Sequence, residues 1–132
     1  MVLIRDCVSS FVASLNQSSK ARKKITVVRY SNIINNICSL LYKKGYIVNY
    51  KIIENNYIVV QSKYHNNLPV ISVIERISRP GRRVFMSNNQ LKDLHKYILG
   101  NSDYVVSTSA GIYTAKDCIL RGLAGELLFK IN

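Results

Sequence analysis

The sequence predicts an α+β fold, built from two small packed subdomains with short mixed sheets. Stretches whose apolar residues recur at helical spacing alternate with stretches rich in β-branched and aromatic residues. Turn signals made of Asn, Gly and Pro separate these stretches. The segment Asn66-Asn67-Leu68-Pro69 is the natural joint, so we expect an N-terminal subdomain over residues 1–66 and a C-terminal one over residues 67–132.

The N-terminal subdomain is expected to begin with an amphipathic helix over residues 4–16, because apolar side chains recur there every three or four residues. A polar loop then runs to residue 24, and residues 25–28 form a short strand. Ser31 suits the N-cap of a second helix, and Gly45 suits the position after its end.

The remaining elements follow from caps and β-rich stretches. Asn88 or Asn89 is expected to cap a helix that runs to about Leu99. Thr114 is expected to cap another helix, which ends at Gly122. The predicted strands, of which the first two form a hairpin, are residues 46–53, 57–64, 70–77, 84–86, 104–109 and 126–131.

The charge points to a polyanion as partner. The 132 residues include 19 Lys and Arg against 7 Asp and Glu, a formal net charge of +12. Both halves are basic, so the excess is not a detachable tail. Nucleic-acid binding is favoured because each phosphate neutralised by Lys or Arg releases condensed counterions. The alternative is charge for solubility alone, which is usually smaller and can have either sign.

Several other classes of protein are excluded. Three cysteines without C-x-x-C spacing predict no disulfide framework and no metal site, and we expect them to be small buried hydrophobes. The two histidines have no neighbouring acid and nucleophile, so we expect no enzyme and no cofactor. No apolar run is long enough for a transmembrane helix, and the first residues lack a secretory or transit segment, so we expect an intracellular protein.

A basic loop precedes the first predicted strand and places four cations among small polar residues. Such a loop is either merely solvated or a phosphate contact, and the net charge favours contact. The four residues are Lys20, Arg22, Lys23 and Lys24.

Two later segments carry chemistry suited to RNA. The turn Ser78-Arg79-Pro80-Gly81-Arg82-Arg83 exposes three guanidinium groups, which suit bidentate contacts with phosphate. In the predicted loop from residue 107 to 114, the hydroxyls of Ser107, Thr108 and Ser109 precede Gly111, which permits a close backbone approach. For each segment the alternative is an ordinary surface loop.

A carboxylate is expected close to these hydroxyls. If the strands that flank both segments pair, the turn ending in Gly125 and Glu126 lies beside the Ser-rich loop. The acid could orient a loop hydroxyl or accept a hydrogen bond from a base amino group. The alternative is a helix end followed by the start of a surface strand.

Together, these segments resemble the ribosomal protein eight family of the small subunit, in its bacterial and organellar form. The matching stretches are residues 78–85, 106–114 and 122–126. Their order and spacing match, and the resemblance covers essentially the whole chain. It implies a two-domain α+β protein that binds a helix of central-domain small-subunit rRNA beside neighbouring ribosomal proteins, with no small-molecule substrate and no membrane. The residues implied for RNA contact are Ser107, Thr108, Ser109, Gly111, Gly125, Glu126, Arg79, Pro80, Gly81, Arg82 and Arg83.

The sequence also departs from the family. Ser10 and Val12 stand where the first helix of the family carries arginines, and the family's Pro-Ser-Ser-Lys segment reads Arg29-Tyr30-Ser31-Asn32. We therefore transfer no RNA contact to Ser10, Val12 or Asn32, and expect the basic loop and Arg29 to replace them. Ala124 stands for the first Gly of the usual Gly-Gly-Glu, which argues against an unusual backbone angle there.

The predicted function is structural: binding small-subunit rRNA and supporting its folding and assembly for translation. One alternative is a free regulatory protein that represses translation by binding an mRNA hairpin. Another is an RNA-modifying enzyme, which the missing catalytic pair argues against. Ile, Asn, Lys and Tyr occur 16, 13, 11 and 9 times, and their codons are rich in A and T. This bias favours a mitochondrial gene, with a plastid-type organelle or an A/T-rich bacterium as alternatives.

Overall fold

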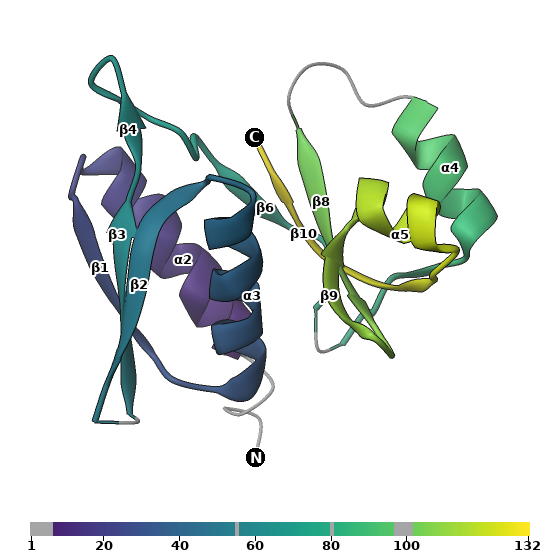
Figure 1. Ribbon diagram of the computed structural model, residues 1–132, viewed down its shortest axis with the longest axis horizontal. Coiled ribbons are helices and arrows are strands. Elements are labelled where there is room, and N and C mark those ends of the chain that lie inside the picture. The colour runs from purple at the N-terminus through teal and green to yellow at the C-terminus, as the bar shows by residue number, and fades with distance from the viewer. Residues whose placement is uncertain (1–6, 55, 80, 97–101) are drawn as a thin grey trace. The chain divides into compact units, whose positions relative to one another are not determined.

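The computed structural model of the protein describes residues 7–54, 56–79, 81–96 and 102–132. The chain divides into two compact units, which we call unit 1 (Met1–Ile74) and unit 2 (Glu75–Asn132) (Figure 1). The boundary between the units lies after Ile74, further along the sequence than the joint predicted at residues 66–69. The side-chain amide of Asn16 explains part of the difference, because its Nδ2 donates to the Ile74 carbonyl (2.9 Å) and its Oδ1 accepts from the Ile74 amide (2.8 Å).

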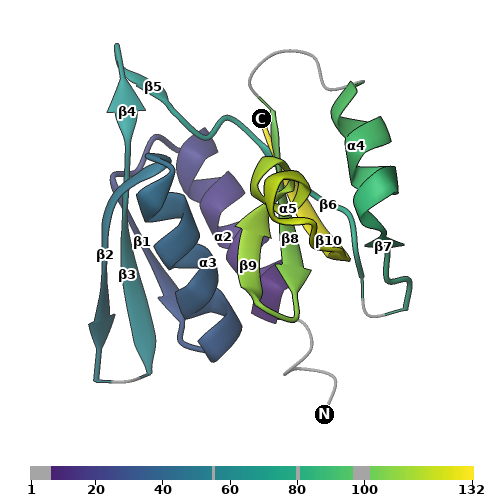
Figure 2. The same cartoon turned by 45° about the vertical axis from the view of Figure 1, so that its right-hand side comes forward.

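Unit 1 consists of an antiparallel three-stranded sheet with two helices on one face (Figure 2). The strands, in the order β1-β3-β2, are β1 (Ile25–Arg29), β3 (Tyr57–Ser62) and β2 (Ile47–Ile53), and the helices are α2 (Cys7–Lys20) and α3 (Asn32–Lys43). The covered face buries Val28, Ile58 and Val60. The alternating residues Ile25 and Val27 are more than half exposed on the other face, as the period of two in a strand requires.

Helix α2 extends past the end predicted at residue 16, so the expected polar loop is partly helical. Its last two serines bond to distant segments instead of competing with the helix. Buried Ser18 accepts a hydrogen bond from Thr26 Oγ1 (2.7 Å), and Ser19 Oγ donates to the Ile71 carbonyl (2.7 Å). The first predicted residues of this helix, 4–6, lie outside the described residues.

The predicted caps of α3 are confirmed. Ser31 precedes the helix in an extended conformation, and its Oγ accepts from the Ile34 amide (3.2 Å). Lys44 is the C-cap and Gly45 follows with a φ of +81°, a conformation that glycine adopts without strain. The predicted hairpin of β2 and β3 is confirmed as well; Asn55 in its turn lies outside the described residues.

The segment predicted as the joint, residues 66–69, lies in a tight hairpin. Strands β4 (Tyr64–His65) and β5 (Leu68–Pro69) pair across Asn66 and Asn67, both with positive φ. The strand predicted over residues 70–77 is wrong for most of its length, because only β6 (Ile74–Arg76) forms. Residues 70–73, which precede β6, form no strand, and their buried side chain is Ile71.

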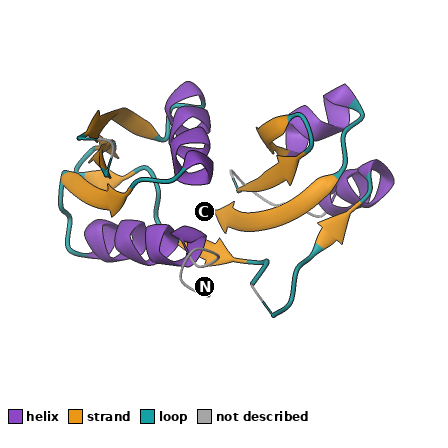
Figure 3. Ribbon diagram, turned by 90° about the horizontal axis from the view of Figure 1, so that it is seen from below, coloured by secondary structure: helices purple, strands orange, loops and turns teal. Residues whose placement is uncertain are grey.

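Unit 2 has a sheet in the order β6-β10-β8-β9, with β7 also paired to β10. The further strands are β7 (Phe85–Met86), β8 (Asp103–Thr108), β9 (Gly111–Thr114) and β10 (Gly125–Ile131). Helices α4 (Asn88–Lys96) and α5 (Ala115–Arg121) pack against each other on the same side of β10 (Figure 3). Leu91, Val106, Cys118 and Leu127 form the buried core between these helices and the sheet.

The cap predicted for α4 is wrong, because Ser87 and not an asparagine caps it. Ser87 Oγ accepts from the Gln90 amide (3.3 Å) and Gln90 Oε1 accepts from the Ser87 amide (2.8 Å), which is a reciprocal capping box. Asn88 instead donates its Nδ2 to the carbonyls of Cys118 and Leu123, both at 3.0 Å. The end predicted near Leu99 lies outside the described residues. For α5, the Thr114 cap and the left-handed Gly122 are confirmed.

The cysteines are free. Cys38 and Cys118 are buried, as predicted, and burial raises the pKa of the Cys38 thiol to about 12. Cys7 is half-buried, with its Sγ 3.7 Å from Ser31 Oγ. In the part of the chain that the structure describes, no group of His, Cys, Asp and Glu could hold a metal ion. The same part contains no helix long and apolar enough to cross a membrane.

Candidate nucleic-acid interface

The Ser-rich segment is mostly strand. The strand predicted over residues 104–109 is confirmed through Thr108, and the loop predicted over residues 107–114 is wrong except for its turn. Ser107 and Thr108 end β8, only Ser109 and Ala110 form the turn, and Gly111 begins β9. Thr108 Oγ1 donates to the Gly111 carbonyl (2.8 Å) and accepts from the Ala110 amide (3.1 Å). The Thr108 hydroxyl therefore holds the turn, while Ser109 is exposed at its tip.

The predicted pairing of the flanking strands is confirmed, and it places Glu126 directly opposite Ser107. On its other edge, β10 pairs with β7, so that Glu126 also lies opposite Phe85. Residues directly opposite each other in antiparallel strands project from the same face. We call this set the Phe85–Glu126–Ser107 row. The next residues, Val106 and Leu127, are buried in the core, so the row faces away from it.

Phe85 is a candidate binding residue that the sequence analysis did not single out. Its side chain is 63% exposed, whereas its neighbours Val84 and Met86 pack against the core. A large aromatic side chain left exposed beside a carboxylate and a hydroxyl is typical of a binding surface. The alternation of Val84, Phe85 and Met86 after an Arg-rich turn was the signal that could have identified it.

Glycine is required at position 125 because the Ser107 backbone lies very close to it, and not because of its backbone angle. A Cβ atom built on Gly125 would overlap the Ser107 carbonyl oxygen and lie 2.9 Å from the Ser107 carbonyl carbon. Glycine therefore lets β10 approach β8 at the residue next to Glu126. Ala124 is not among the described residues with positive φ, as its identity predicted.

The Arg-rich turn is a tight hairpin with an anchored base. The Arg79 and Arg82 backbones exchange two hydrogen bonds of 2.9 Å. Ser78, which is 1% exposed, accepts from the Val84 amide through Oγ (2.9 Å). Gly81 is exposed, and Pro80 lies outside the described residues.

The guanidinium groups of this turn are free to bind an anion. Arg79, Arg82 and Arg83 are exposed, and within the described ranges no carboxylate pairs with them. Arg83 is two residues before Phe85, and the intervening Val84 packs inward. The turn therefore presents cations next to one end of the Phe85–Glu126–Ser107 row.

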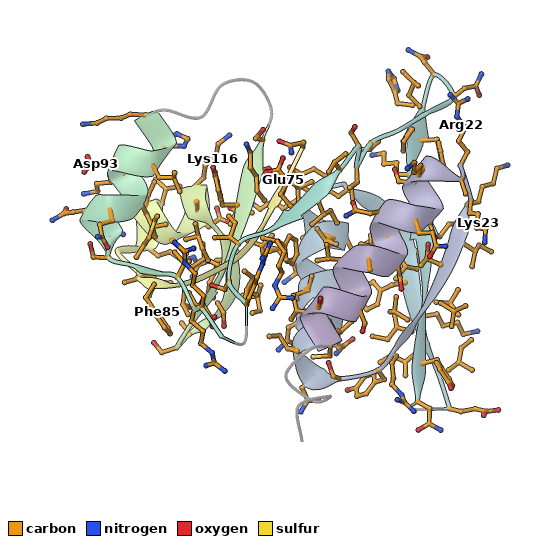
Figure 4. All side chains as sticks on the ribbon, turned by 180° about the vertical axis from the view of Figure 1, so that it is seen from behind. Arg22, Lys23, Glu75, Phe85, Asp93 and Lys116 are labelled. Atoms are coloured by element: carbon orange, nitrogen blue, oxygen red, sulfur yellow. The ribbon has the colours of Figure 1, made fainter. Side chains whose placement is uncertain are left out.

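In unit 1, the predicted basic loop is the end of α2 and the turn that follows. We call Lys20, Arg22, Lys23 and Lys24 the basic turn. Its backbone is fixed, because the Lys23 amide donates to the Ser18 carbonyl (2.9 Å) and the Lys23 carbonyl accepts from Tyr64 Oη (2.7 Å). All four side chains are exposed, and Figure 4 shows Arg22 and Lys23 projecting outward.

Arg29 is not part of the basic turn. It lies at the far end of β1, five residues after Lys24, and is exposed. The sequence-predicted residues of unit 1 thus form two separate cationic sites, one at each end of β1.

Two comparisons with known proteins found similar sequences over nearly the whole chain. The family model described as ribosomal protein S8 matches residues 6–132. The small ribosomal subunit protein uS8 of Chlorobium phaeovibrioides is 36% identical over 132 residues, which covers 97% of this chain and 98% of that protein. The uS8 proteins of Pelodictyon phaeoclathratiforme and Chlorobaculum tepidum are 34% and 35% identical with the same coverage.

Proposed function

Because this chain belongs to the ribosomal protein S8 family, we propose that the Phe85–Glu126–Ser107 row and the adjoining β8–β9 turn form its rRNA-reading surface. The protein is a structural constituent of the small ribosomal subunit and not an enzyme. It binds small-subunit rRNA and lies among neighbouring ribosomal proteins.

The observation that carries the proposal is the strand register, which brings an exposed aromatic ring, a half-buried carboxylate and a half-buried hydroxyl to one face. RNA offers 2′-hydroxyls and base edges in a shallow minor groove, and unpaired bases at irregular positions. The Ser107 hydroxyl can donate to or accept from a 2′-hydroxyl, and the Glu126 carboxylate can accept from a base amino group. The exposed Phe85 ring can stack on an unpaired base. The row therefore fits an irregular RNA helix better than a uniform duplex.

The remaining cations supply affinity without sequence preference. Arg79, Arg82 and Arg83 suit phosphates next to the row, and the basic turn with Arg29 suits phosphates elsewhere on the RNA. Contacts of this kind position a protein on RNA and make its binding depend on salt.

The test is binding of the purified protein to the central-domain rRNA hairpin and to a scrambled duplex across a salt series. Specific recognition predicts a preference of about a thousandfold or more at physiological salt. Phe85→Ala should reduce that preference, whereas Leu120→Ala, which alters the 84% exposed Leu120 on α5, should not. Parallel, steeply salt-dependent curves for both RNAs would contradict a reading surface.

We also propose that the ribosome in question is mitochondrial. The support is the excess of Ile, Asn, Lys and Tyr, whose codons are A/T-rich, as in many organellar genes. The relatives compared above are bacterial, and a plastid-type organelle or an A/T-rich bacterium are the alternatives. Sequencing DNA from purified mitochondria of the source organism should recover the gene. Recovery from plastid DNA or a bacterial chromosome would contradict the proposal.

A further inference from the structure

We infer that unit 1 carries a second RNA site, which takes an unpaired nucleotide between Arg29, Tyr30 and Tyr57. The inference rests on the proposed RNA-binding function, but it concerns a different unit and a different form of RNA.

Two hollows in the surface of unit 1 meet at Arg29 and Tyr30. One has a volume of about 320 Å³ and is lined by these two residues with Asn56 and Tyr57. The other, of about 380 Å³, continues along α2 past Ser10 and Ser14. A nucleotide needs a hollow of this size, since small-molecule sites begin at about 300 Å³.

The strand register fixes the walls of the first hollow. Arg29 of β1 lies directly opposite Tyr57 of β3, so both side chains project from the open face of the sheet. The Tyr30 amide donates to the Asn56 carbonyl (2.9 Å), and the Tyr30 hydroxyl donates to Asn32 Oδ1 (3.3 Å). Tyr57 is 47% exposed, which leaves ring surface available to a ligand.

The chemistry of the lining selects single-stranded RNA. Bases stack on aromatic rings whatever their identity, and the guanidinium of Arg29 suits the adjoining phosphate. The Asn56 side-chain amide can bond a base edge, and the serines of the second hollow can bond a ribose hydroxyl. The residues that line the two hollows include no acid.

A protein partner suits the hollow at Tyr57 less well. Its four lining residues include no aliphatic side chain, although Ile25 and Val27 are exposed elsewhere on the same sheet face.

The experiment titrates the full chain with an oligouridylate of about eight nucleotides, within the range that one binding fold covers, and separately with the rRNA hairpin. Tyr57→Leu keeps apolar bulk in the strand but removes the ring, and should weaken oligouridylate binding about tenfold. Tyr57→Phe should restore it, and Arg29→Gln should weaken it and reduce its salt dependence. Hairpin binding at low salt should persist in all three variants.

Two matched variants serve as controls. Tyr42→Leu removes a ring that is 51% exposed on α3, and Lys43→Gln removes an exposed cation beside it. Tyr42→Leu should leave oligouridylate binding unchanged. Lys43→Gln should weaken it only as much as the loss of one positive charge explains. If Tyr57→Leu and Tyr42→Leu behave alike while the hairpin still binds, the inference is wrong, the proposed function stands, and a protein becomes the better occupant of the sheet face. If neither RNA binds, both proposals are wrong.

Discussion

The two units present their candidate RNA-binding residues in different ways. In unit 2, Ser107 and Glu126 are held opposite each other by strand pairing, and Gly125 lets the strands approach at that point. In unit 1, the basic turn has a fixed backbone, but its charged side chains extend into solvent. Unit 2 therefore offers a defined geometry at the Phe85–Glu126–Ser107 row, whereas the basic turn of unit 1 offers mainly charge.

This difference suggests a division between specificity and affinity. Charged groups on long side chains adjust to many phosphate positions and so distinguish poorly between RNAs. Short side chains in a strand register cannot adjust, so they bind well only to an RNA of matching shape. Substitutions in the Phe85–Glu126–Ser107 row should accordingly alter the preference between RNAs, and those in the basic turn the total affinity.

The largest effect is expected from Gly125→Ala. The new methyl group would overlap the Ser107 carbonyl, which is backbone and cannot rotate away. We expect a decrease of about 3 kcal/mol in the free energy of unfolding, as in other overpacked sites, together with loss of hairpin preference. Urea denaturation and hairpin titration measure the two effects. Gly81→Ala is the control for the unfolding measurement, since a Cβ there meets no atom within 4 Å.

A smaller but more selective effect is expected from replacing Ser107 and Ser109 with Ala. Removing each hydroxyl should cost about 1 kcal/mol of hairpin binding, the usual net value of a hydrogen bond. Binding to a scrambled duplex should change little, and competition between the two RNAs gives the ratio directly. Equal losses for both RNAs would mean that the hydroxyls do not read shape.

The opposite pattern is expected from Lys23→Gln combined with Lys24→Gln. Binding to the hairpin and to the scrambled duplex should weaken alike, because both RNAs offer the same phosphates. The slope of log affinity against log salt should flatten by about one for each phosphate that is no longer neutralised. A salt series with both RNAs measures this. An unchanged slope would place the basic turn outside the interface.

The smallest effect is expected from Ser31→Ala, which separates folding from binding within unit 1. Removing the hydrogen bond to the Ile34 amide should lower the free energy of unfolding by about 1 kcal/mol, the usual value of an N-cap. Affinity for either RNA should remain as in the parent chain under conditions where the protein is folded. Urea denaturation with RNA titration tests this, and a fall in hairpin affinity would show that the cap also supports binding.

Local signals predicted much of the fold. Ser31, Gly45, Thr114 and Gly122 act through neighbours within a few residues, so the sequence alone sufficed to assign their roles as caps. The placement of Glu126 beside Ser107 was predicted on the condition that the flanking strands pair, and β8 and β10 do pair, although β9 and α5 lie between them in the sequence.

The predictions of local structure were wrong where the conformation of a segment depends on residues far away in the sequence. Ser18 and Ser19 suggested a loop, but their partners Thr26 and Ile71 allow them to end a helix. Residues 111–114 were assigned to a loop because hydroxyl-rich sequence favours turns, whereas pairing with β8 makes them strand β9. The exposure of Phe85 depends on which face of β7 packs inward, and the pairing of β7 with β10 decides that, although the alternation of Val84, Phe85 and Met86 indicates it.

The bond between Asn16 and Ile74 also constrains the order in which the protein can be made. The two residues are 58 positions apart, and their paired hydrogen bonds fasten the C-terminal half of α2. During translation these hydrogen bonds cannot form until residue 74 has left the exit tunnel. Until then, α2 of the nascent chain lacks this stabilisation. A fragment cut after residue 66 would lack the partner permanently. Anyone expressing unit 1 by itself should therefore end the fragment no earlier than Ile74.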